Sequence, residues 1–195
     1  MTIDAKAIEA LFTQARTANR FLPKPVEAQQ LAEIYDLMKW GPTSMNGSPV
    51  RFVFLTTPQA RARLLPALFD ANIKRAESAP VIAIVGQDLE FFDHLPRLYP
   101  SSPQAIKLFE KNEIAAQITA LRNSTLQGAY LIMAARAVGL DCGPMSGFDN
   151  GYVDQEFFAG TRIKSNFLCS IGYADPDSTY PRAPRFSFEE VCQIL

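Results

Sequence analysis

The chain has 195 residues, of which 48% are hydrophobic and 20% are charged, with 19 Lys and Arg against 20 Asp and Glu. This composition predicts one globular domain over residues 1–195, long enough to bury a full core without disulfides or a structural metal. The net charge of -1 creates no long-range field that would gather nucleic acid or anionic lipid. We therefore expect neither nucleic acid nor a membrane as a partner.

Cysteine usage and the N-terminus favour a cytoplasmic protein. Cys142, Cys169 and Cys192 are odd in number, widely spaced and without a histidine cluster, which argues against a zinc site and a disulfide scaffold. We expect buried, reduced thiols. The first sixteen residues lack the apolar core of a signal peptide. Arginines and amides interrupt the apolar segment 114–140, which predicts a long soluble helix rather than a membrane span.

Apolar side chains recur at helical spacing in several segments. Thr57 followed by Pro58 is typical of a helix start, and Ser187 to Glu190 form a capping box. The helices expected on these grounds cover residues 8–15, 31–38, 58–68 and 113–138, with a last one from 188 onward.

Runs of apolar and β-branched residues predict strands at 52–55, 81–85, 141–143 and 166–173. The continuously apolar run 81–85 is typical of a strand covered on both faces, so it belongs in the middle of the sheet. Residues 88–112 are rich in proline and aromatics, and this excursion could form a lid over a pocket. The irregular alternation of elements indicates one α+β domain. No Gly-x-Gly-x-x-Gly follows the first strand, which argues against a Rossmann site.

Four segments are rich in groups that suit a flat, hydroxylated, phosphorylated ligand. They are residues 15–21, 40–49, 139–149 and 181–185. Arginine offers a fork of donors to phosphate oxygens, and exposed backbone N–H groups can meet other acceptors. Each segment alone has a plain structural explanation, as a basic helix end, a solvated turn or a helix stop. Their order and spacing together are more specific.

In this order the four segments resemble the nitroreductase superfamily of flavin enzymes, over nearly the whole chain. The phrases WGPTSMNGSP, RNSTLQGAYLI, GLDCGPMSGFD and PRAPRFSFEE resemble the RutE-type subgroup of NAD(P)H nitroreductases and malonic semialdehyde reductases. The resemblance implies a nitroreductase-like α+β fold with a central, mostly antiparallel sheet flanked by helices. It also implies an intertwined homodimer that binds two FMN molecules in the subunit interface.

The resemblance assigns cofactor contacts by position. Arg16, Thr17 and Asn19 would meet the phosphate and ribityl end of FMN, and Arg182 and Arg185 would hold the phosphate. Asn72 would hydrogen-bond the flavin edge. The residues that would line the ring, partly from the neighbouring subunit, are Pro42, Thr43, Ser44, Asn46 and Ser48. Backbone atoms facing N5 and O4 of the ring would come from Pro144, Met145, Ser146 and Gly147.

The sequence departs from the family pattern at several of these positions. Ala15 stands where the family usually has its first phosphate arginine, so Arg16 or Arg20 must take that role. Ser48, Val50 and Ser146 replace a common Gln, Trp and Glu, which alters the stacking surface and the polar rim of the substrate pocket.

The resemblance further implies that NADH or NADPH passes a hydride to the flavin, which then reduces a small acceptor from the same face. Arg16, Asn72 and Lys74 are candidates for the donor near N1 and O2 of the ring. Neither a catalytic side chain nor a metal is required, and His94 is expected at the surface or in the lid. A different class of interpretation is a flavin-binding or redox-sensing module without turnover.

One variant of the implied activity reduces malonic semialdehyde to 3-hydroxypropanoate. This reaction needs a cation for the substrate carboxylate. Arg122, Lys164 and Arg51 are the candidates, although each could instead form a surface or structural ion pair.

Overall fold

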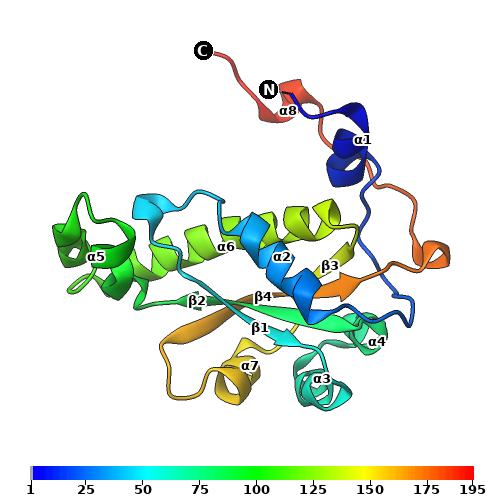
Figure 1. Ribbon diagram of the computed structural model, residues 1–195, viewed down its shortest axis with the longest axis horizontal. Coiled ribbons are helices and arrows are strands. Elements are labelled where there is room, and N and C mark those ends of the chain that lie inside the picture. Colours follow the sequence, from blue (N-terminus) through cyan, green and yellow to red (C-terminus); the bar gives the residue numbers. More distant parts are fainter. Residues whose placement is uncertain (1) are drawn as a thin grey trace.

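A four-stranded antiparallel sheet in the order β1-β2-β4-β3 forms the centre of the computed structural model, which describes residues 2–195 (Figure 1). The strands are β1 Val50–Leu55, β2 Val81–Asp88, β3 Asp141–Met145 and β4 Ile163–Gly172. The helices are α1 Ala5–Ile8, α2 Ala28–Met38, α3 Pro58–Leu64, α4 Asp70–Ser78, α5 Leu95–Leu98, α6 Glu113–Ala137, α7 Asn150–Phe157 and α8 Phe188–Val191. The predicted α+β class with an antiparallel sheet is confirmed.

Helices cover both faces of the sheet. Figure 1 shows α2 and α6 on one face and α3, α4 and α7 on the other. Alternate residues of β2 point to opposite faces, so Val81 and Val85 pack in the core beneath α2 and α6. Ile82 and Ile84 pack in the core beneath the other helices. The expectation that residues 81–85 lie in the middle of the sheet, covered on both faces, is confirmed.

All four strands extend further than the sequence predicted; β1 begins at Val50 and β2 ends at Asp88. β3 continues through Pro144 to Met145, because it is an edge strand and proline is tolerated where no ladder N–H is needed. β4 begins at Ile163, since Ile163 pairs with Asp88 of the central strand.

Three helices were not predicted, namely α4, α7 and the single-turn α5 in the segment between β2 and α6. α4 has a largely polar and charged sequence, and α7 is a short helix whose N-cap Asp149 accepts a hydrogen bond from the N–H of Tyr152. Both are held in place by apolar contacts with the sheet, through Ala76 in α4 and Val153 in α7. Tertiary packing rather than periodicity creates them.

The segment between β2 and α6 is folded. It forms short 3-10 turns and α5, and its apolar side chains pack in a cluster of their own against the first turns of α6. Phe91 and Leu95 are fully buried there, and Phe91 contacts Phe109 with ring centroids 5.0 Å apart. The predicted excursion is therefore a small subsidiary core.

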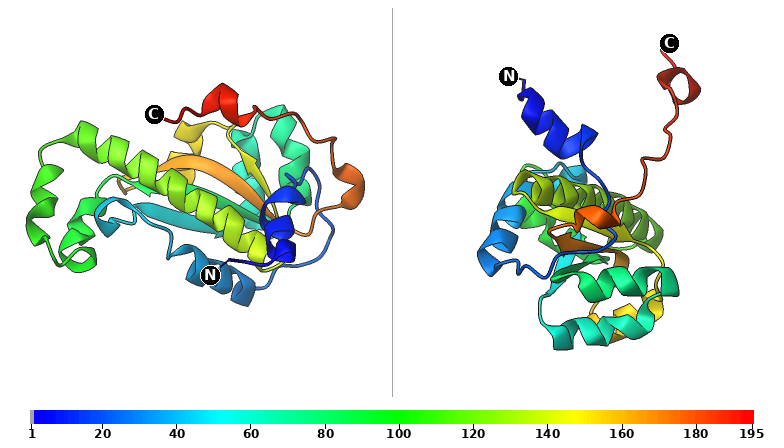
Figure 2. Two further views of the ribbon diagram at one scale, coloured as in Figure 1. Left: turned by 90° about the horizontal axis from the view of Figure 1, so that it is seen from above. Right: turned by 90° about the vertical axis from the view of Figure 1, so that its right-hand side faces the viewer.

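Both ends of the chain project from the same side of the body and diverge from each other (Figure 2). The first helix continues past α1 as a π-helical turn, Glu9–Thr13, and its apolar residues Ile8 and Phe12 are exposed. The C-terminal segment leaves the sheet after β4 and carries the exposed side chains Phe186 and Phe188. The predicted capping box at Ser187 is present, but the helix that it opens is only one turn long.

Cys142 and Cys169 are buried and free, as predicted, whereas Cys192 is exposed. The expectation of three buried thiols was wrong for Cys192 because this residue lies in the projecting C-terminal segment. Within residues 2–195, none of the helices combines the length and the apolar character that a bilayer crossing requires.

Candidate functional site

Arginines converge on a pocket of about 460 Å³ at the end of the first helix. Its lining includes Arg16, Thr17, Asn19, Arg136, Arg182 and Arg185. The lining contains no carboxylate, and none of the four arginines forms an ion pair within residues 2–195. Because the like charges repel one another, this arginine pocket favours an anionic ligand.

Backbone carbonyls accept hydrogen bonds from all four arginines; Arg136 donates to Leu11, and Arg185 donates to Ala183 and Pro184. Arg16 donates to the carbonyl of Tyr180. Arg182 Nη2 donates to the carbonyls of Thr13 and Ala15, at 2.8 and 3.1 Å. These contacts join the C-terminal segment to the end of the first helix, and they fix the guanidinium groups without neutralising their charge.

The segment after the first helix lies along the edge strand β3. Thr17 and Cys142 form an isolated parallel bridge, and the N–H of Ala18 donates to the carbonyl of Cys142 at 2.9 Å. A Cβ at Gly143 would lie 2.6 Å from the carbonyl oxygen of Ala18, so the close approach requires glycine. This packing places residues 15–21, the basic segment, beside the end of β3 and the loop that follows it.

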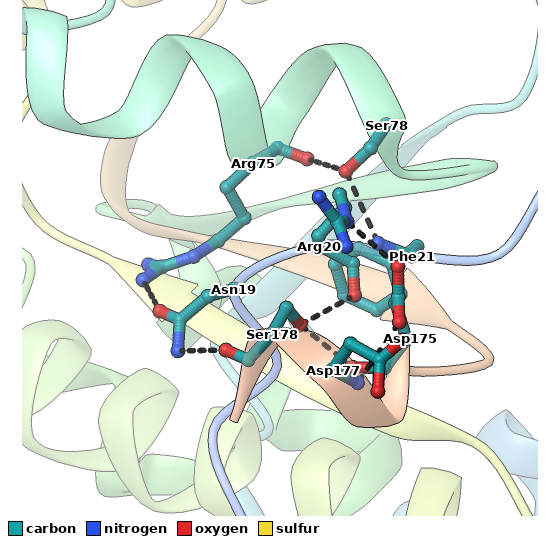
Figure 3. Close-up of polar contacts among 8 residues, drawn as sticks. All are labelled: Asn19, Arg20, Phe21, Arg75, Ser78, Asp175, Asp177 and Ser178. Carbon is teal, nitrogen blue, oxygen red and sulfur yellow. Dashed lines mark hydrogen bonds and ion pairs between the residues drawn. The ribbon is translucent and has the colours of Figure 1, made fainter. Parts of the chain in front are cut away.

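Arg75 connects the basic segment to the end of β3. Its Nη2 donates to Asn19 Oδ1 at 2.6 Å (Figure 3). Its Nη1 donates to the carbonyl of Pro144 at 3.3 Å. Its Nε is buried and has no partner among residues 2–195. Burial lowers the pKa of the Arg75 guanidinium. Since a buried donor without a partner is costly, Arg75 presents an unmet requirement for an acceptor atom at this point.

A second pocket, of about 590 Å³, lies on the other side of Asn19. Three cations, Arg20, Lys74 and Arg75, and one carboxylate, Asp177, line it. It shares Asn19 and Tyr180 with the arginine pocket. The two hollows therefore adjoin each other across Asn19 and Tyr180. Together they form an elongated cationic site.

Arg20 joins the segment after the first helix to the segment after β4 (Figure 3). Its Nε lies 2.7 Å from Asp175 Oδ2, and its carbonyl accepts a hydrogen bond from the N–H of Asp175 at 2.9 Å. The Arg20 hydrogen bond is the main reason that the pKa of Asp175 lies below its ordinary value. Of the two arginines that could replace the family's first phosphate arginine, Arg16 lines the arginine pocket and Arg20 is paired.

Asn72 and the loop after β3 contact each other directly. Asn72 Nδ2 donates to the carbonyl of Gly147 at 2.9 Å, and a Cβ at Gly147 would lie 2.8 Å from that nitrogen. Met145 is buried in the core, so only its backbone faces the site, whereas Ser146 is exposed. The Asn72 contact fixes the loop against α4.

Buried side-chain amides of α6 hold the polar loop, residues 42–49, which precedes β1. Asn123 Oδ1 accepts from the N–H of Ser44 at 2.8 Å, and Gln127 Oε1 accepts from the N–H of Val50 at 3.0 Å. Asn123 and Gln127 are each only 4% exposed. Pro42 lies at the start of the loop. Within the loop, Thr43 Oγ1 accepts a hydrogen bond from the N–H of Ser48 at 3.2 Å.

The same loop has an unusual backbone. Met45, Asn46 and Ser48 have φ of 53°, 52° and 41°, a left-handed conformation that costs roughly 1–2 kcal/mol per ordinary residue. Asn46 Nδ2 donates to the carbonyl of Leu98 at 2.8 Å and thereby ties the loop to α5. Strain of this kind is typical of functional sites, where surrounding contacts maintain it.

Within one chain the predicted site residues fall into two groups. At about 1.5 Å per residue, the stretch of α6 from Asn123, which holds the polar loop, to Arg136, which lines the arginine pocket, spans about 20 Å. The structure brings together Arg16, Thr17, Asn19, Asn72, Pro144, Met145, Ser146, Gly147, Arg182 and Arg185. It does not bring Pro42, Thr43, Ser44, Asn46 and Ser48 to them.

The three cations considered for a substrate carboxylate are placed differently. Arg51 Nη2 lies 2.6 Å from Asp88 Oδ2, and Lys164 lies 3.4 Å from an oxygen of Asp154. Arg122 is exposed on α6. Of the three, Arg51 lines a pocket with residues of the polar loop.

The sequence profile of the nitroreductase family matches residues 13–173. The chain belongs to the nitroreductase family. A protein from Cupriavidus pinatubonensis, named "putative NADH dehydrogenase/NAD(P)H nitroreductase", is 52% identical over 189 residues, which are 96% of each chain. A protein of the same name from Stenotrophomonas maltophilia is 54% identical over 192 residues, covering 98% of this chain and 97% of its own.

Solved structures of proteins named as nitroreductases share the fold. A "putative nitroreductase" from Bacillus subtilis superposes with a TM-score of 0.86 at 20% identity, covering 98% of this chain and all of its own. Another, from Exiguobacterium sibiricum and in complex with FMN, has a TM-score of 0.84 at 20% identity, covering all of this chain and 98% of its own. At this identity the likeness establishes the nitroreductase fold.

The sequence interpretation missed four residues that build the candidate site. Arg75 follows Asn72 by three residues, which places both side chains on one face of a helix, but α4 was not predicted. Arg136, Asn123 and Gln127 are the polar breaks in the long apolar helix. Their polarity within that pattern was the available signal, and it was interpreted only as evidence against a membrane span.

Proposed function

We propose that this nitroreductase-family protein is an FMN-dependent NAD(P)H oxidoreductase. The observation that carries the proposal is the arginine pocket, in which Arg16, Arg136, Arg182 and Arg185 converge without a carboxylate. The names of the relatives with 52% and 54% identity and the FMN complex of a structural neighbour support it.

The donor set fits a flavin phosphate at one end of the site. Arginine forks bind phosphate oxygens through charge-assisted hydrogen bonds, and Thr17 and Asn19 adjoin them with groups suited to ribityl hydroxyls. At the other end, the buried Nε of Arg75 lacks an acceptor, which the polar edge of a flavin ring would supply. We assign Arg75 as the donor near N1 and O2, in place of Arg16, Asn72 and Lys74.

Bound FMN supplies the redox chemistry, because it accepts a hydride from NAD(P)H and returns two electrons to an electrophilic acceptor. The chain's own residues orient the cofactor and tune it. Asn72 holds the loop 144–147 in place through Gly147, and Arg75 places a positive charge beside the ring. In this scheme the side chains bind and orient the reactants, and none is a nucleophile.

We further propose a homodimer. The polar loop lies about 20 Å along α6 from the arginine pocket, so in a shared site the loop of one subunit would meet the pocket of its partner. Exposed apolar residues lie on the solvent-facing side of α6, with Ile114, Ile118 and Leu121 on one face and Leu126 and Tyr130 on a different flank. An exposed apolar face such as that of Ile114, Ile118 and Leu121 is typical of an interaction surface. The projecting C-terminal segment, with Phe186 and Phe188 exposed, would pack against the second copy.

The acceptor is a small electrophilic molecule. Malonic semialdehyde is the specific acceptor that the subgroup suggests, and its carboxylate would require a cation at the site. The cytoplasmic location stays a prediction.

The bound cofactor provides the first test of the proposal. The purified protein should be yellow, and denaturation should release free FMN, because no cysteine or histidine lines the proposed cofactor pockets for a covalent link. Colour that stays with the precipitated protein, or release of FAD, would contradict the assignment.

Turnover separates an enzyme from a flavin-binding module. Steady NAD(P)H oxidation with menadione or a nitroarene is expected. A bound flavin that NAD(P)H cannot reduce would favour the module instead.

A further inference from the structure

A pocket of about 530 Å³ lies between the end of α2, the polar loop and α5. Asn46 and Ser48 of the polar loop, which are expected to line the flavin ring, form part of its wall. Tyr35 and Trp40 add aromatic surface, and Trp40 is 80% exposed. A hollow of this size, with aromatic walls beside a redox centre, suits a small organic reactant.

The charge of this pocket is one-sided. Lys39, Arg51 and Arg97 line it together with His94, and no Asp or Glu of residues 2–195 lines it. Lys39 is paired with Asp36, and Arg51 is paired with Asp88. Arg97 forms no hydrogen bond or ion pair through its side chain within residues 2–195. It therefore brings an uncompensated positive charge to the pocket.

The backbone that carries Arg97 is fixed relative to the polar loop. Leu95 of α5 is fully buried in the small core beside α6, and the carbonyl of Leu98 accepts the 2.8 Å hydrogen bond from Asn46. Asn46 adopts its left-handed conformation, with φ of 52°, and asparagine tolerates this better than most residues. The contacts on both sides of Arg97 thus set its distance from the loop.

We propose that Arg97 is a specificity-determining residue that receives the carboxylate of a small anionic acceptor. This inference rests on the proposed oxidoreductase function and names the class of acceptor for the same site. Guanidinium binds a carboxylate through two parallel hydrogen bonds, while Tyr35 and Trp40 cover the apolar part of the molecule. Arg51 is already paired with Asp88, so Arg97 rather than Arg51 makes the direct contact.

Binding of two matched probes tests the proposal without turnover. Benzoate and benzamide have nearly the same shape and differ in charge, so calorimetric titration of the flavin-loaded protein with each measures the discrimination directly. We expect the wild type to bind benzoate about 10-fold more tightly than benzamide, as a charge-assisted pair allows. Arg97→Ala should reduce the ratio of the two affinities to near one, and Arg97→Lys should restore part of it.

Lys107→Ala is the matched control, since Lys107 is an exposed cation of the same segment that does not line the pocket. This control should keep the wild-type ratio. Equal affinity of the wild type for the two probes would overturn the proposal, and so would a ratio that is unchanged in Arg97→Ala.

Steady-state kinetics show whether the anion that Arg97 binds belongs to the acceptor or to the nucleotide. With 4-nitrobenzoate and 4-nitrobenzamide as acceptors, the kcat/KM preference for the charged acceptor should fall about 10-fold in Arg97→Ala, with NADH and with NADPH alike. A variant in which only the KM for NADPH rises would assign Arg97 to the nucleotide phosphate and overturn the carboxylate assignment. Menadione turnover by the wild type distinguishes failure of the proposed oxidoreductase function from failure of the Arg97 assignment. Its absence would reject the oxidoreductase function, whereas its presence without charge preference would reject only the role of Arg97.

Discussion

The guanidinium of Arg75 and the side-chain amide of Asn19 are joined by a hydrogen bond of 2.6 Å between Nη2 and Oδ1. Asn19 belongs to the segment expected at the phosphate and ribityl end of the cofactor. Arg75 also reaches the carbonyl of Pro144, in the loop expected at the ring. One side chain of α4 thus sets the spacing between the two parts of the site.

Replacing Arg75 with Met should weaken FMN binding and lower the reduction potential of the bound flavin. The cation beside the ring stabilises the two-electron reduced form, and a loss of about 1–2 kcal/mol corresponds to about 20–45 mV for a two-electron couple. Dye equilibration measures the potential. Arg63→Met is the control, because Arg63 pairs with Glu156 away from both cofactor pockets. An unchanged potential and an unchanged Kd for FMN would remove Arg75 from the site.

Replacing Arg185 with Ala should weaken FMN binding far more than it affects folding. A charge-assisted contact to phosphate contributes roughly 1.5–3 kcal/mol, which is about 10- to 150-fold in affinity. In the structure Arg185 Nη1 bonds only to the carbonyls of Ala183 and Pro184, so the substitution removes no long-range contact. Titration of the apoprotein with FMN gives the Kd, and thermal unfolding of the apoprotein serves as the control.

The neighbouring Arg182 could substitute in part, so the double replacement should bind FMN more weakly than either single variant. Arg182 also bonds to the carbonyls of Thr13 and Ala15, and its loss should loosen the C-terminal segment as well. If the double variant keeps the wild-type Kd, the phosphate is held by Arg16 and Arg136 instead.

The flavin-bound protein should sediment at about twice 21.6 kDa. A double substitution on the apolar face of α6, Ile118→Asp with Leu121→Asp, should shift it toward the monomer and reduce flavin content, because burying charge in an interface is costly. Gln59→Asp on α3, exposed on the opposite face of the sheet, should leave the mass unchanged. A fully flavin-loaded monomer of the wild type would refute the shared site.

The ion pair between Arg20 and Asp175 should make stability depend on acidity. The pKa of Asp175 is lowered in the folded protein, first by Arg20. Its contribution is therefore complete above the ordinary pKa of an aspartate, about 3.9, and is lost as the pH falls through the lowered folded-state value. The Asp175→Asn variant should have a lower Tm than the wild type at pH 6. This difference in Tm should become smaller below about pH 4. A difference that is constant from pH 6 to pH 3 would show that the charge of Asp175 is unimportant.

Local patterns predicted the sheet core and the long helix well. The continuously apolar, β-branched run 81–85 is typical of a strand covered on both faces. The long helix begins at Glu113 as predicted and ends at Ala137, one residue before the predicted end. The edge strand β3 was predicted too short because Pro144 and the glycines around it read as a turn. Pro144 pairs with Cys169 of β4, which is distant in sequence, and no local pattern contains that information.

The candidate site was predictable where side-chain chemistry is concentrated in a short segment, as at Arg16 and at Arg182. It was not predictable where one residue acts through a distant partner. Asn123 and Gln127 hold the polar loop from positions 79 and 77 residues further along the sequence than their partners. Arg75 likewise joins two segments that are far apart in sequence. These roles arise from tertiary contacts rather than from sequence spacing.

The most direct measurement for the oxidoreductase assignment is anaerobic mixing of the purified, flavin-loaded protein with NADH or NADPH, followed by menadione. We predict that the visible flavin absorbance is lost on addition of the nucleotide and recovers on addition of the acceptor, in two separable steps. Absorbance that persists with both nucleotides, in protein shown to contain FMN, would contradict the assignment.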